Sequence, residues 1–296
     1  MPTAELARLG VVVHPERDLR HALATLQDWA SRRSADVVQI RVPGNPREVA
    51  PAGTAESSDL VVALGGDGTT LAALHAAAAV NRPVLGVACG SLGALSAVTA
   101  DEIGEALDRV EADDWHVRAV PALLAQFDGG EIRAINDLVL VRRGAGQIAV
   151  EVRIGGERFV GFAGDGLIAA TPLGSTAYTL ASGGPMLAPG TDGLVLTPLA
   201  PHGGVCPPVV TAPGTEVLVT LDPAHGGARI ESDGRPRHEA PPFERVRFEL
   251  TYEPRFAELV ALGMGESLIT GLRRRRILID SPRMQIRDDR AAAQPR

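Results

Sequence analysis

Residues 60–71 read LVVALGGDGTTL, an apolar run that ends in a glycine-rich turn. Leu60–Leu64 predicts a buried strand, because the run is short, wholly apolar and bounded by a turn signal. Thr69–Val80 predicts a helix that begins directly after the glycines. A strand that passes through glycines into a helix is one unit of a parallel sheet. This stretch therefore restricts the N-terminal part of the chain to an α/β fold.

Strand-like and helix-like segments alternate on both sides of this turn. The alternation predicts a parallel sheet that has helices on its faces. Pro43–Gly53 is a longer connector that is rich in proline and glycine. The other predicted elements are the strands Leu9–His14, Asp36–Val42 and Pro83–Val87 and the helices His21–Arg32 and Ile103–Glu111.

The pattern changes near Trp115. From there to about Thr251, short strand-like runs are separated by glycine and proline, and helical spacing is nearly absent. Such a segment predicts a β-rich domain. The predicted strands are Val117–Phe127, Ala134–Arg142, Ala149–Ile154, Glu157–Phe162, Gly166–Ala170, Gly193–Pro198, Glu216–Leu221, Ala228–Glu231 and Arg245–Leu250.

The predicted fold class is therefore α/β + β, an N-terminal Rossmann-like α/β domain followed by a β-rich (sandwich-like) domain. We expect the first domain to cover residues 1–116 and the second to cover residues 117–251. Residues 252–296 form a C-terminal segment that can return to the first domain. Its last residues, RDDRAAAQPR, are predicted to be disordered.

All 29 basic residues are arginine. The absence of lysine excludes a P-loop lysine, a protein-kinase lysine and a Schiff base. A net charge of −7 argues against a nucleic-acid-binding surface. No apolar run approaches the roughly 18 residues of a membrane span, so the cytoplasm is the expected location. Phosphate, if it is bound, has to be held by backbone amides, arginine or a metal.

The turn formed by Gly65, Gly66, Asp67 and Gly68 is a candidate phosphate site. Its free N–H groups and the positive end of the helix dipole both favour phosphate. It is not a dinucleotide fingerprint, because the third glycine of G-x-G-x-x-G is missing. Asp67 repels phosphate unless Mg²⁺ bridges them or the carboxylate faces a hydroxyl that loses its proton. The alternative is that Asp67 caps the helix.

Other polar stretches have more than one interpretation. Gly161–Pro185 reads GFAGDGLIAATPLGSTAYTLASGGP, whose hydroxyls could bind ribose or phosphate or could belong to a polar loop. Asn136 and Asp137 head an apolar strand, where they could hold a sugar diol or form a turn. Arg273–Arg276 is interpreted as a solvated face. The histidines have no metal-ligand spacing, so no protein metal site is predicted.

Together, these residues resemble the NAD kinase family, whose members use ATP or polyphosphate. Three motifs occur in the family's order, LGGDGT at 64–69, an Asn-acid pair at 136–137 and GDGLIAATPLGSTAYTLASGGP at 164–185. PVLGVACGSLGAL at 83–95 and TPLAPH at 197–202 are similar to two further family segments. GGDGT also occurs in lipid kinases, whereas the match at 164–185 is far more specific.

The resemblance implies a kinase that transfers the γ-phosphoryl group of ATP, bound with Mg²⁺, to the 2′-hydroxyl of the adenosine ribose of NAD. Asp67 would be the general base or the metal organiser. Residues 1–116 would bind phosphate, and residues 117–251 would bind the dinucleotide and form a homodimer or homotetramer. The implied phosphate ligands are Gly65, Gly66, Gly68 and Thr69, and the implied dinucleotide ligands are Asn136, Asp137, Asp165, Thr176, Ala177 and Tyr178.

Several positions depart from the family pattern. Asp137 stands where the family mostly has glutamate, and Leu173 and Ala181 stand where hydroxyls are common. Ala88-Cys89 replaces an asparagine and a polar or basic residue, and Cys206–Pro208 replaces an Asn-Arg-Pro element. Two alternatives therefore stay open, a divergent kinase that acts on another sugar or nucleoside hydroxyl, and a non-catalytic dinucleotide-binding module. A dehydrogenase is the weakest alternative because the fingerprint is incomplete.

Overall fold

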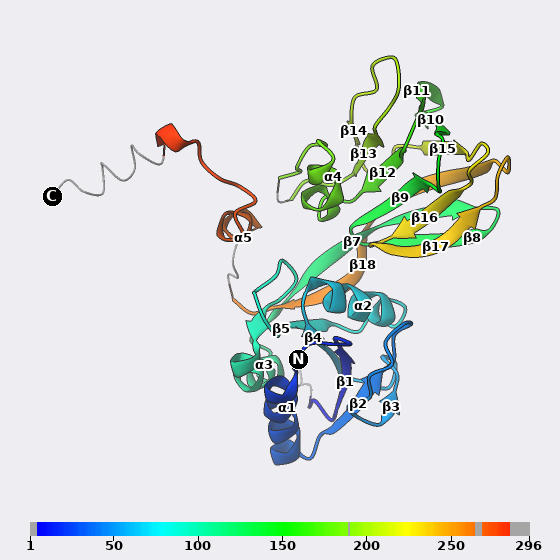
Figure 1. Cartoon of the computed structure of the whole chain (residues 1–296). Coiled ribbons are helices and arrows are strands. Elements are labelled where there is room, and N and C mark those ends of the chain that lie inside the picture. The colour runs from blue at the N-terminus through cyan, green and yellow to red at the C-terminus, as the bar shows by residue number, and fades with distance from the viewer. Residues whose placement is uncertain (1–4, 189, 264–267, 285–296) are drawn as a thin grey trace. The chain divides into compact units, whose positions relative to one another are not determined.

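The computed structural model describes residues 5–188, 190–263 and 268–284 (Figure 1). The chain divides into two compact units that are each discontinuous in sequence. Unit 1 comprises residues 1–70, 85–116 and 260–296, and unit 2 comprises residues 71–84 and 117–259. The stretch RDDRAAAQPR, which is predicted to be disordered, lies outside the described residues. Within the described ranges, no helix is both long and apolar enough to cross a membrane.

Unit 1 contains a sheet with the strand order β5-β4-β1-β2-β3, in which β1 pairs in parallel with β2 and β4 (Figure 1). β1 and β4 are buried along almost their whole length, as expected for strands that are covered on both faces. The apolar runs predict the longer strands and miss the two-residue strands β3 and β6. The strands are β1 (Arg8–Val13), β2 (Asp36–Ile40), β3 (Ala52–Gly53), β4 (Leu60–Gly65), β5 (Val84–Ala88) and β6 (Val98–Thr99).

Two helices of unit 1, α1 (Arg20–Arg33) and α3 (Ile103–Glu111), contact each other and share one apolar core with the sheet. α1 buries Leu26 and Trp29 at the spacing of one helix face. Trp29 is 1% exposed, and its indole N–H donates to Oδ1 of Asp108 at 2.7 Å. That bond satisfies the one polar atom of the buried ring.

The strand order of this sheet changes direction at β1, which lies between β2 and β4. The loops that follow β1 and β4 therefore open at the same carboxyl edge. Backbone hydrogen bonds join the carboxyl ends of β1, β4 and β5. The amide of His14, after β1, donates to the carbonyl of Leu64 at 3.0 Å, and the amide of Cys89, after β5, donates to the carbonyl of Gly65 at 2.8 Å. Ligands of open α/β sheets bind at such a point. The glycine turn after β4 thus lies where a ligand is expected.

Unit 2 is dominated by β-strands. Its short helical elements are η2 (Gly174–Thr176) and α4 (Tyr178–Ala181), and the remaining helical elements of the chain are α2 (Asp67–Ala78), η1 (Ala100–Glu102) and α5 (Leu268–Arg274). The strands are β7 (His116–Phe127), β8 (Gly130–Ala134), β9 (Asp137–Arg142), β10 (Ile148–Ile154), β11 (Glu157–Gly164), β12 (Gly166–Ala170), β13 (Leu194–Leu199), β14 (Val209–Thr211), β15 (Val217–Asp222), β16 (Ala228–Ser232), β17 (Arg235–Ala240) and β18 (Val246–Ala261).

The strands of unit 2 form two layers. One sheet has the order β14-β13-β12-β9-β16-β17, and the other layer contains β11-β10-β15-β18 with β7 and β8. Buried residues alternate with more exposed ones along β15 and β16, the pattern of a half-buried sheet. The core cluster takes Leu140 and Ile230 from the first sheet and Val219 and Phe248 from the second. Unit 2 is therefore a sandwich, and the predicted α/β + β fold class is confirmed.

Most predicted elements differ from the observed ones by one or two residues at their ends, and three differences bear on the fold or the site. The predicted strand Ala134–Arg142 begins too early, because Ala134 is the last residue of β8 and the chain passes at Ile135-Asn136 to the other sheet, where β9 begins. The predicted strand Arg245–Leu250 continues to Ala261 as β18. The helix expected from Thr69 begins two residues earlier, so Asp67 is its first residue.

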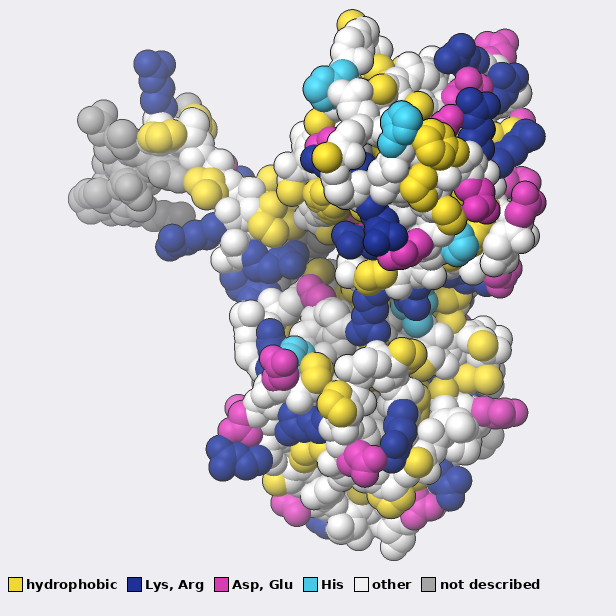
Figure 2. Space-filling view, turned by 45° about the vertical axis from the view of Figure 1, so that its right-hand side comes forward, with side chains coloured by type: hydrophobic (Ala, Val, Ile, Leu, Met, Phe, Trp, Pro, Cys, Tyr) yellow, Lys and Arg dark blue, Asp and Glu magenta, His cyan; other side chains and the backbone are white. Residues whose placement is uncertain are grey.

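Charges of both signs are intermixed on the outer strands of unit 2 (Figure 2). On β10 and β11, Glu151 lies 3.9 Å from Arg153 and 3.4 Å from Arg158. Exposed pairs of this kind contribute about 0–1 kcal/mol each. They keep these strands polar without forming a surface of one sign.

Candidate active site

Asp67 lies in unit 1 directly after the glycines that end β4. Its Oδ2 accepts the amide N–H of Ala94 and its Oδ1 accepts that of Leu95, both at 3.0 Å. These amides belong to the loop after β5. A Cβ added to Gly93 would lie 2.0 Å from Oδ1, so only glycine leaves room for this arrangement. The orientation of Asp67 is set by another loop, with 34% of the side chain exposed, and helix capping does not account for it.

The glycine turn is packed on one side and open on the other. A Cβ added to Gly65 would lie 2.2 Å from Oγ1 of Thr69, whose side chain is buried. The amide of Thr69 donates to the carbonyl of Gly66 at 2.9 Å. A Cβ added to Gly68 would meet nothing within 4 Å. Gly65 and Thr69 therefore shape the turn, and Gly68 lies on its open side.

Arg17 is a candidate that sequence reasoning missed. It follows β1, and its Nη1 donates to the carbonyl of Cys89 at 3.3 Å. The same atom would lie 3.4 Å from a Cβ on Gly66. The ring of His14 accepts the amide of Arg17 at 3.1 Å and so fixes this loop. The guanidinium can supply a positive charge beside the turn. Its position after the strand next to β4 is the signal that could have found it.

The interpretation of Arg273–Arg276 as a solvated face holds for the exposed Arg273, Arg274 and Arg276 and is wrong for Arg275. Nη1 of Arg275 lies 3.8 Å from Oδ2 of Asp67, and the Arg275 side chain is 27% exposed. Nη2 of Arg274 donates to the carbonyl of Leu92 at 3.1 Å. The end of α5 therefore contacts both the aspartate and the loop after β5, which no local spacing in the sequence indicates.

In unit 2, Asn136 and Asp137 lie where the chain enters β9. Thr171 holds this segment through two carbonyls, because its Oγ1 donates to Ile135 at 2.6 Å and its amide donates to Asn136 at 2.9 Å. A Cβ added to Gly174 would lie 1.9 Å from the carbonyl oxygen of Asn136. The Asn-Asp pair and the hydroxyl-rich stretch are thus brought together.

Asp137 is a buried acid with a perturbed pKa. It is 5% exposed. Its burial, together with the nearby carboxylates of Asp233 and Glu231, raises its pKa to about 7. Such shifts are common at functional sites, although buried structural pairs also produce them. At neutral pH the carboxyl group is therefore divided between its two protonation states.

The hydroxyl-rich stretch contains both structural and accessible residues. Ser175 is buried, and its Oγ donates to one backbone carbonyl at 2.6 Å and accepts one amide at 2.9 Å. Thr176, Ala177 and Tyr178 lie at the turn between η2 and α4, where Ala177 is exposed and Tyr178 is 45% exposed. These three predicted residues lie in a part of the stretch that a ligand can reach.

Asp165 is not brought to this set. It precedes β12, whose far end, Ala170, pairs in register with Asp137. At about 3.4 Å per residue, the two ends of β12 are roughly 14 Å apart. Oδ1 of Asp165 accepts Nε of Arg142 at 2.6 Å, so the carboxylate already has a cationic partner. Within one chain, Asp165 lies away from Asn136 and Asp137.

The donor set of the described residues does not form a dedicated metal cage. Across these residues, no group of three His, Cys, Asp or Glu side chains is placed to hold a metal. Mg²⁺ with nucleotides is commonly held by one or two carboxylates together with the phosphates. The half-exposed carboxylate of Asp67 fits that arrangement, in which most of the ligands come from the nucleotide and water.

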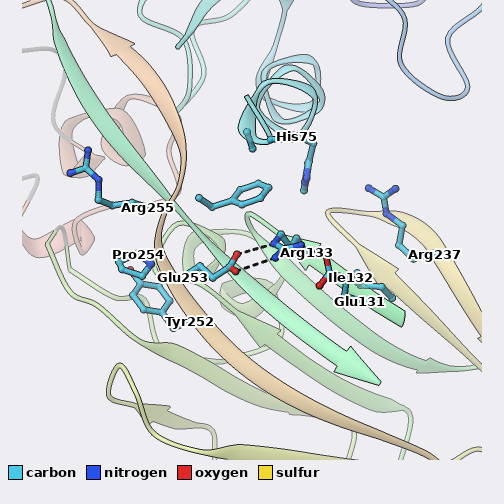
Figure 3. Close-up of a pocket in the computed structure, with 12 residues that line it drawn as sticks. His75, Glu131, Ile132, Arg133, Arg237, Tyr252, Glu253, Pro254 and Arg255 are labelled. Atoms are coloured by element: carbon cyan, nitrogen blue, oxygen red, sulfur yellow. Dashed lines mark hydrogen bonds and ion pairs between the residues drawn. The ribbon is translucent and has the colours of Figure 1, made fainter. Parts of the chain in front are cut away.

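A cavity of about 890 Å³ in unit 2 is lined by residues of α2, β8 and β18 (Figure 3). Arg133 lies in it between two carboxylates, 3.0 Å from Glu253 and 2.5 Å from Glu131. Its guanidinium also lies 5.9 Å from the ring centroid of Phe256. The lining, as far as the structure describes it, contains no predicted site residue. This cavity is therefore distinct from the two candidate residue sets.

Models of two protein domains match the sequence. The ATP-NAD kinase N-terminal domain matches residues 3–115, and the ATP-NAD kinase C-terminal domain matches residues 135–260. The chain belongs to the ATP-NAD kinase family. The predicted family is therefore confirmed, and so is the predicted enzyme class, a phosphotransferase with an alcohol acceptor.

Individual relatives agree with this family over most of their length. The NAD kinase of Heliobacterium modesticaldum is 34% identical over 247 residues, which cover 80% of this chain and 86% of the relative. The NAD kinase of Haloarcula marismortui is 34% identical over 274 residues, which cover 83% of this chain and 93% of the relative.

Solved structures share the fold. Yeast NADH kinase, solved in complex with NADH, has a TM-score of 0.77 at 20% identity. The match covers 94% of this chain and 89% of the yeast chain. An NAD kinase from Archaeoglobus fulgidus, solved in complex with ATP, has a TM-score of 0.65 at 23% identity. The match covers 86% of this chain and 93% of the Archaeoglobus chain.

Gly93→Ala is expected to lower the turnover number of the kinase at least tenfold. The new Cβ would collide with Oδ1 of Asp67 and displace the carboxylate from its two amides. Gly104→Ala in α3 is the matched control, since its nearest neighbour would be a Trp29 ring carbon at 3.9 Å. It should stabilise the protein by about 0.5–1 kcal/mol with unchanged turnover. Full activity of Gly93→Ala in steady-state assays would contradict the argument.

Asp137→Asn is expected to stabilise the protein at pH 8 but not near pH 4. The folded state raises the pKa of Asp137 from 3.8 to about 7, so ionising it costs stability as pH rises through this interval. The variant should gain about 1–3 kcal/mol over the wild type at pH 8, measured by urea unfolding.

Asp222→Asn tests the sign of this effect, because Arg245 lowers the pKa of Asp222. That variant should lose stability at pH 8 and approach the wild type in acid. A gain for Asp137→Asn that does not depend on pH would count against the buried-acid explanation.

Proposed function

We propose that this protein transfers the γ-phosphoryl group of ATP to the 2′-hydroxyl of the adenosine ribose of NAD, which yields NADP and ADP. The proposal is supported by the family, by relatives named NAD kinase and by the Archaeoglobus fulgidus homologue solved with ATP. One observation carries it. Asp67 is oriented by one amide on each carboxylate oxygen and remains partly exposed beside the glycine turn.

Asp67 is the group that prepares the acceptor hydroxyl. A carboxylate oxygen that accepts one amide keeps a lone pair for an O–H donor. As the hydroxyl oxygen bonds to the γ-phosphorus, the bond from that phosphorus to the β–γ bridging oxygen breaks. The hydroxyl proton passes to Asp67, and ADP leaves. Phosphoryl transfer of this kind depends mainly on positioning and on charge stabilisation.

The phosphates bind at the glycine turn. The N-terminus of α2 presents amides and a positive dipole end, which favour anions. Gly66 and Gly68 allow close approach, Gly65 and Thr69 keep the turn in shape, and Arg17 adds a cation in a chain without lysine. Mg²⁺ bound with ATP would supply further charge neutralisation, and Asp67 is the residue that would hold it.

The dinucleotide binds through residues of unit 2. An ionised Asp137 and the amide of Asn136 have the acceptors and donors that a ribose diol requires. The exposed ring of Tyr178 offers a stacking surface beside Thr176 and Ala177. These assignments are supported by the backbone bonds that join the two segments through Thr171.

We include a homodimer or homotetramer and a cytoplasmic location in the proposal. Asp165 supports the oligomer. It lies at the end of β12 that is remote from Asn136 and Asp137, so as a dinucleotide ligand it would serve the site of another copy of the chain. Sedimentation velocity of the purified protein, with and without NAD, tests this arrangement.

The acceptor is tested directly with purified protein, ATP and MgCl₂, and with NAD, NADH, nucleosides and sugars offered separately. An NADP-specific dehydrogenase detects the expected product, and ³¹P NMR identifies the 2′-phosphate. Faster turnover of another hydroxyl compound would favour a divergent kinase. NAD binding in calorimetry without any turnover would favour a non-catalytic module.

Asp67→Ala is expected to lower the turnover number by a factor of about 10² to 10⁴, the usual range for general-base assistance. The fold should persist, because the amides released at Ala94 and Leu95 lie beside a partly exposed site. Asp28→Ala, an exposed aspartate of α1, is the control and should keep full activity. Circular dichroism melts check the fold, and normal turnover of Asp67→Ala would reject the assigned role.

Arg17→Ala is expected to raise the KM for ATP about tenfold or more while the KM for NAD changes little. The reason is that a charge-assisted bond to phosphate is worth about 1.5–3 kcal/mol. Arg20→Ala is the control, because Arg20 pairs with Asp18 and its side chain is 89% exposed. Initial rates over a grid of both substrates separate the two constants. An unchanged KM for ATP would remove Arg17 from the donor site.

A further inference from the structure

Asp233 is a buried carboxylate that binds three consecutive backbone amides. Its side chain is 5% exposed. Oδ2 accepts the N–H of Ile135 at 3.1 Å, and Oδ1 accepts those of Asn136 at 2.6 Å and Asp137 at 3.3 Å. Its own amide donates to the carbonyl of Asp137 at 3.0 Å. The amides of the segment through which the chain changes sheets are therefore all held by one side chain.

The same segment is held from its carbonyl side by Thr171, which bonds to Ile135 and Asn136. The backbone of the Asn-Asp pair thus has partners for its amides and for its carbonyls. The side-chain torsions of Asn136 and Asp137 are then the main freedom left to the pair. Any group that fixes this backbone also fixes the direction in which both side chains leave it.

His75 on α2 supports the carboxylate. Its Nε2 lies 2.7 Å from Oδ2 of Asp233, and its side chain is 23% exposed. The ring lies edge-on to Phe256, with centroids 5.6 Å apart, on the wall of the unit 2 cavity (Figure 3). His75 therefore contacts the same oxygen, Oδ2, that accepts the amide of Ile135, and helps to orient the carboxylate.

A structural turn alone does not require a charged residue here. Asp233 has a φ of +51°, a conformation that asparagine adopts as readily as aspartate. The carboxylate does supply two acceptor oxygens, since Oδ1 accepts two amides and Oδ2 accepts a third beside His75, whereas asparagine has a single acceptor oxygen. The charged and titratable groups that act on Asp137 are Asp233 and Glu231, and His75 contacts Asp233. The aspartate therefore imposes an electrostatic effect in addition to a shape.

We propose that Asp233, supported by His75, is a positioning pair that sets both the direction and the charge of the Asn136–Asp137 pair toward the ribose diol of the acceptor. The inference rests on the proposed function, since it takes these two residues as acceptor ligands. Asp233 acts through them and does not itself touch the substrate. The inference adds two positioning residues that no motif of the sequence indicates.

Asp233→Asn tests the pair, because it keeps the left-handed turn and removes the charge together with one of the two acceptor oxygens. We expect the KM for NAD to rise about tenfold, with the KM for ATP unchanged within twofold. The acid limb of kcat/KM for NAD should move to lower pH, since a neutral amide no longer opposes ionisation of Asp137. Asp222→Asn is the matched control, because Asp222 also accepts a turn amide, that of Ala224 at 3.1 Å. It should change neither quantity.

His75→Gln provides a second variant if Asp233→Asn does not fold. It should raise the KM for NAD several-fold and leave the KM for ATP unchanged. His21→Gln is its control, since His21 pairs with Asp101 in an exposed contact. Equal loss of activity at all substrate concentrations, with an unchanged pH limb, would mean a merely structural role and would overturn the inference.

A titration without substrate separates this inference from the proposed function. Carboxyl ¹³C NMR of aspartate-labelled protein follows Asp137 in the wild type and in Asp233→Asn or His75→Gln. We expect the pKa of Asp137 to fall in Asp233→Asn, and the amide signals of residues 135–137 to shift in both variants. An unchanged Asp137 titration in Asp233→Asn would overturn the positioning pair. Failure of the wild type to phosphorylate NAD would instead overturn the proposed acceptor.

Discussion

Hydrogen bonds from backbone amides to aspartate carboxylates fix the key segments of both units. In unit 1, the amides of Ala94 and Leu95 hold Asp67, and in unit 2, Asp233 holds the amides of residues 135–137. Amides at the ends of strands need acceptors, and a carboxylate makes a stronger bond with them than a neutral oxygen does. The roles differ, because Asp67 is the held group whereas Asp233 is the holding group.

The absence of lysine shapes the electrostatics of the site. In the proposed function, phosphate binding falls to the glycine turn, the start of α2 and arginine. The structure places Arg17 against Gly66 and Arg275 near Asp67. Guanidinium groups stay charged at all relevant pH values and present several donors. One acidic group of unit 2 behaves differently. Asp137 is buried beside other carboxylates, so its charge depends on pH near neutrality.

Local patterns predicted the elements well and the contacts between them poorly. The apolar runs at Leu60–Leu64 and Gly166–Ala170 match β4 and β12 closely, because burial on both faces selects uninterrupted apolar strands. The run Ala134–Arg142 was harder, since the division at Ile135-Asn136 depends on Asp233, far away in the sequence. Arg275 was misinterpreted for the same reason, because its partner Asp67 lies at the other end of the chain.

The sequence by itself determined the fold class, the family and the glycine turn with its aspartate, because these depend on hydrophobic period and on short motifs. Tertiary structure alone decided that Asp67 is oriented by the loop after β5, that Thr171 joins the two motifs of unit 2, and that Asp165 lies apart from them. The physical reason is that hydrogen bonds and steric exclusion act between atoms within a few ångströms. Chain topology, and not sequence spacing, determines which residues come that close.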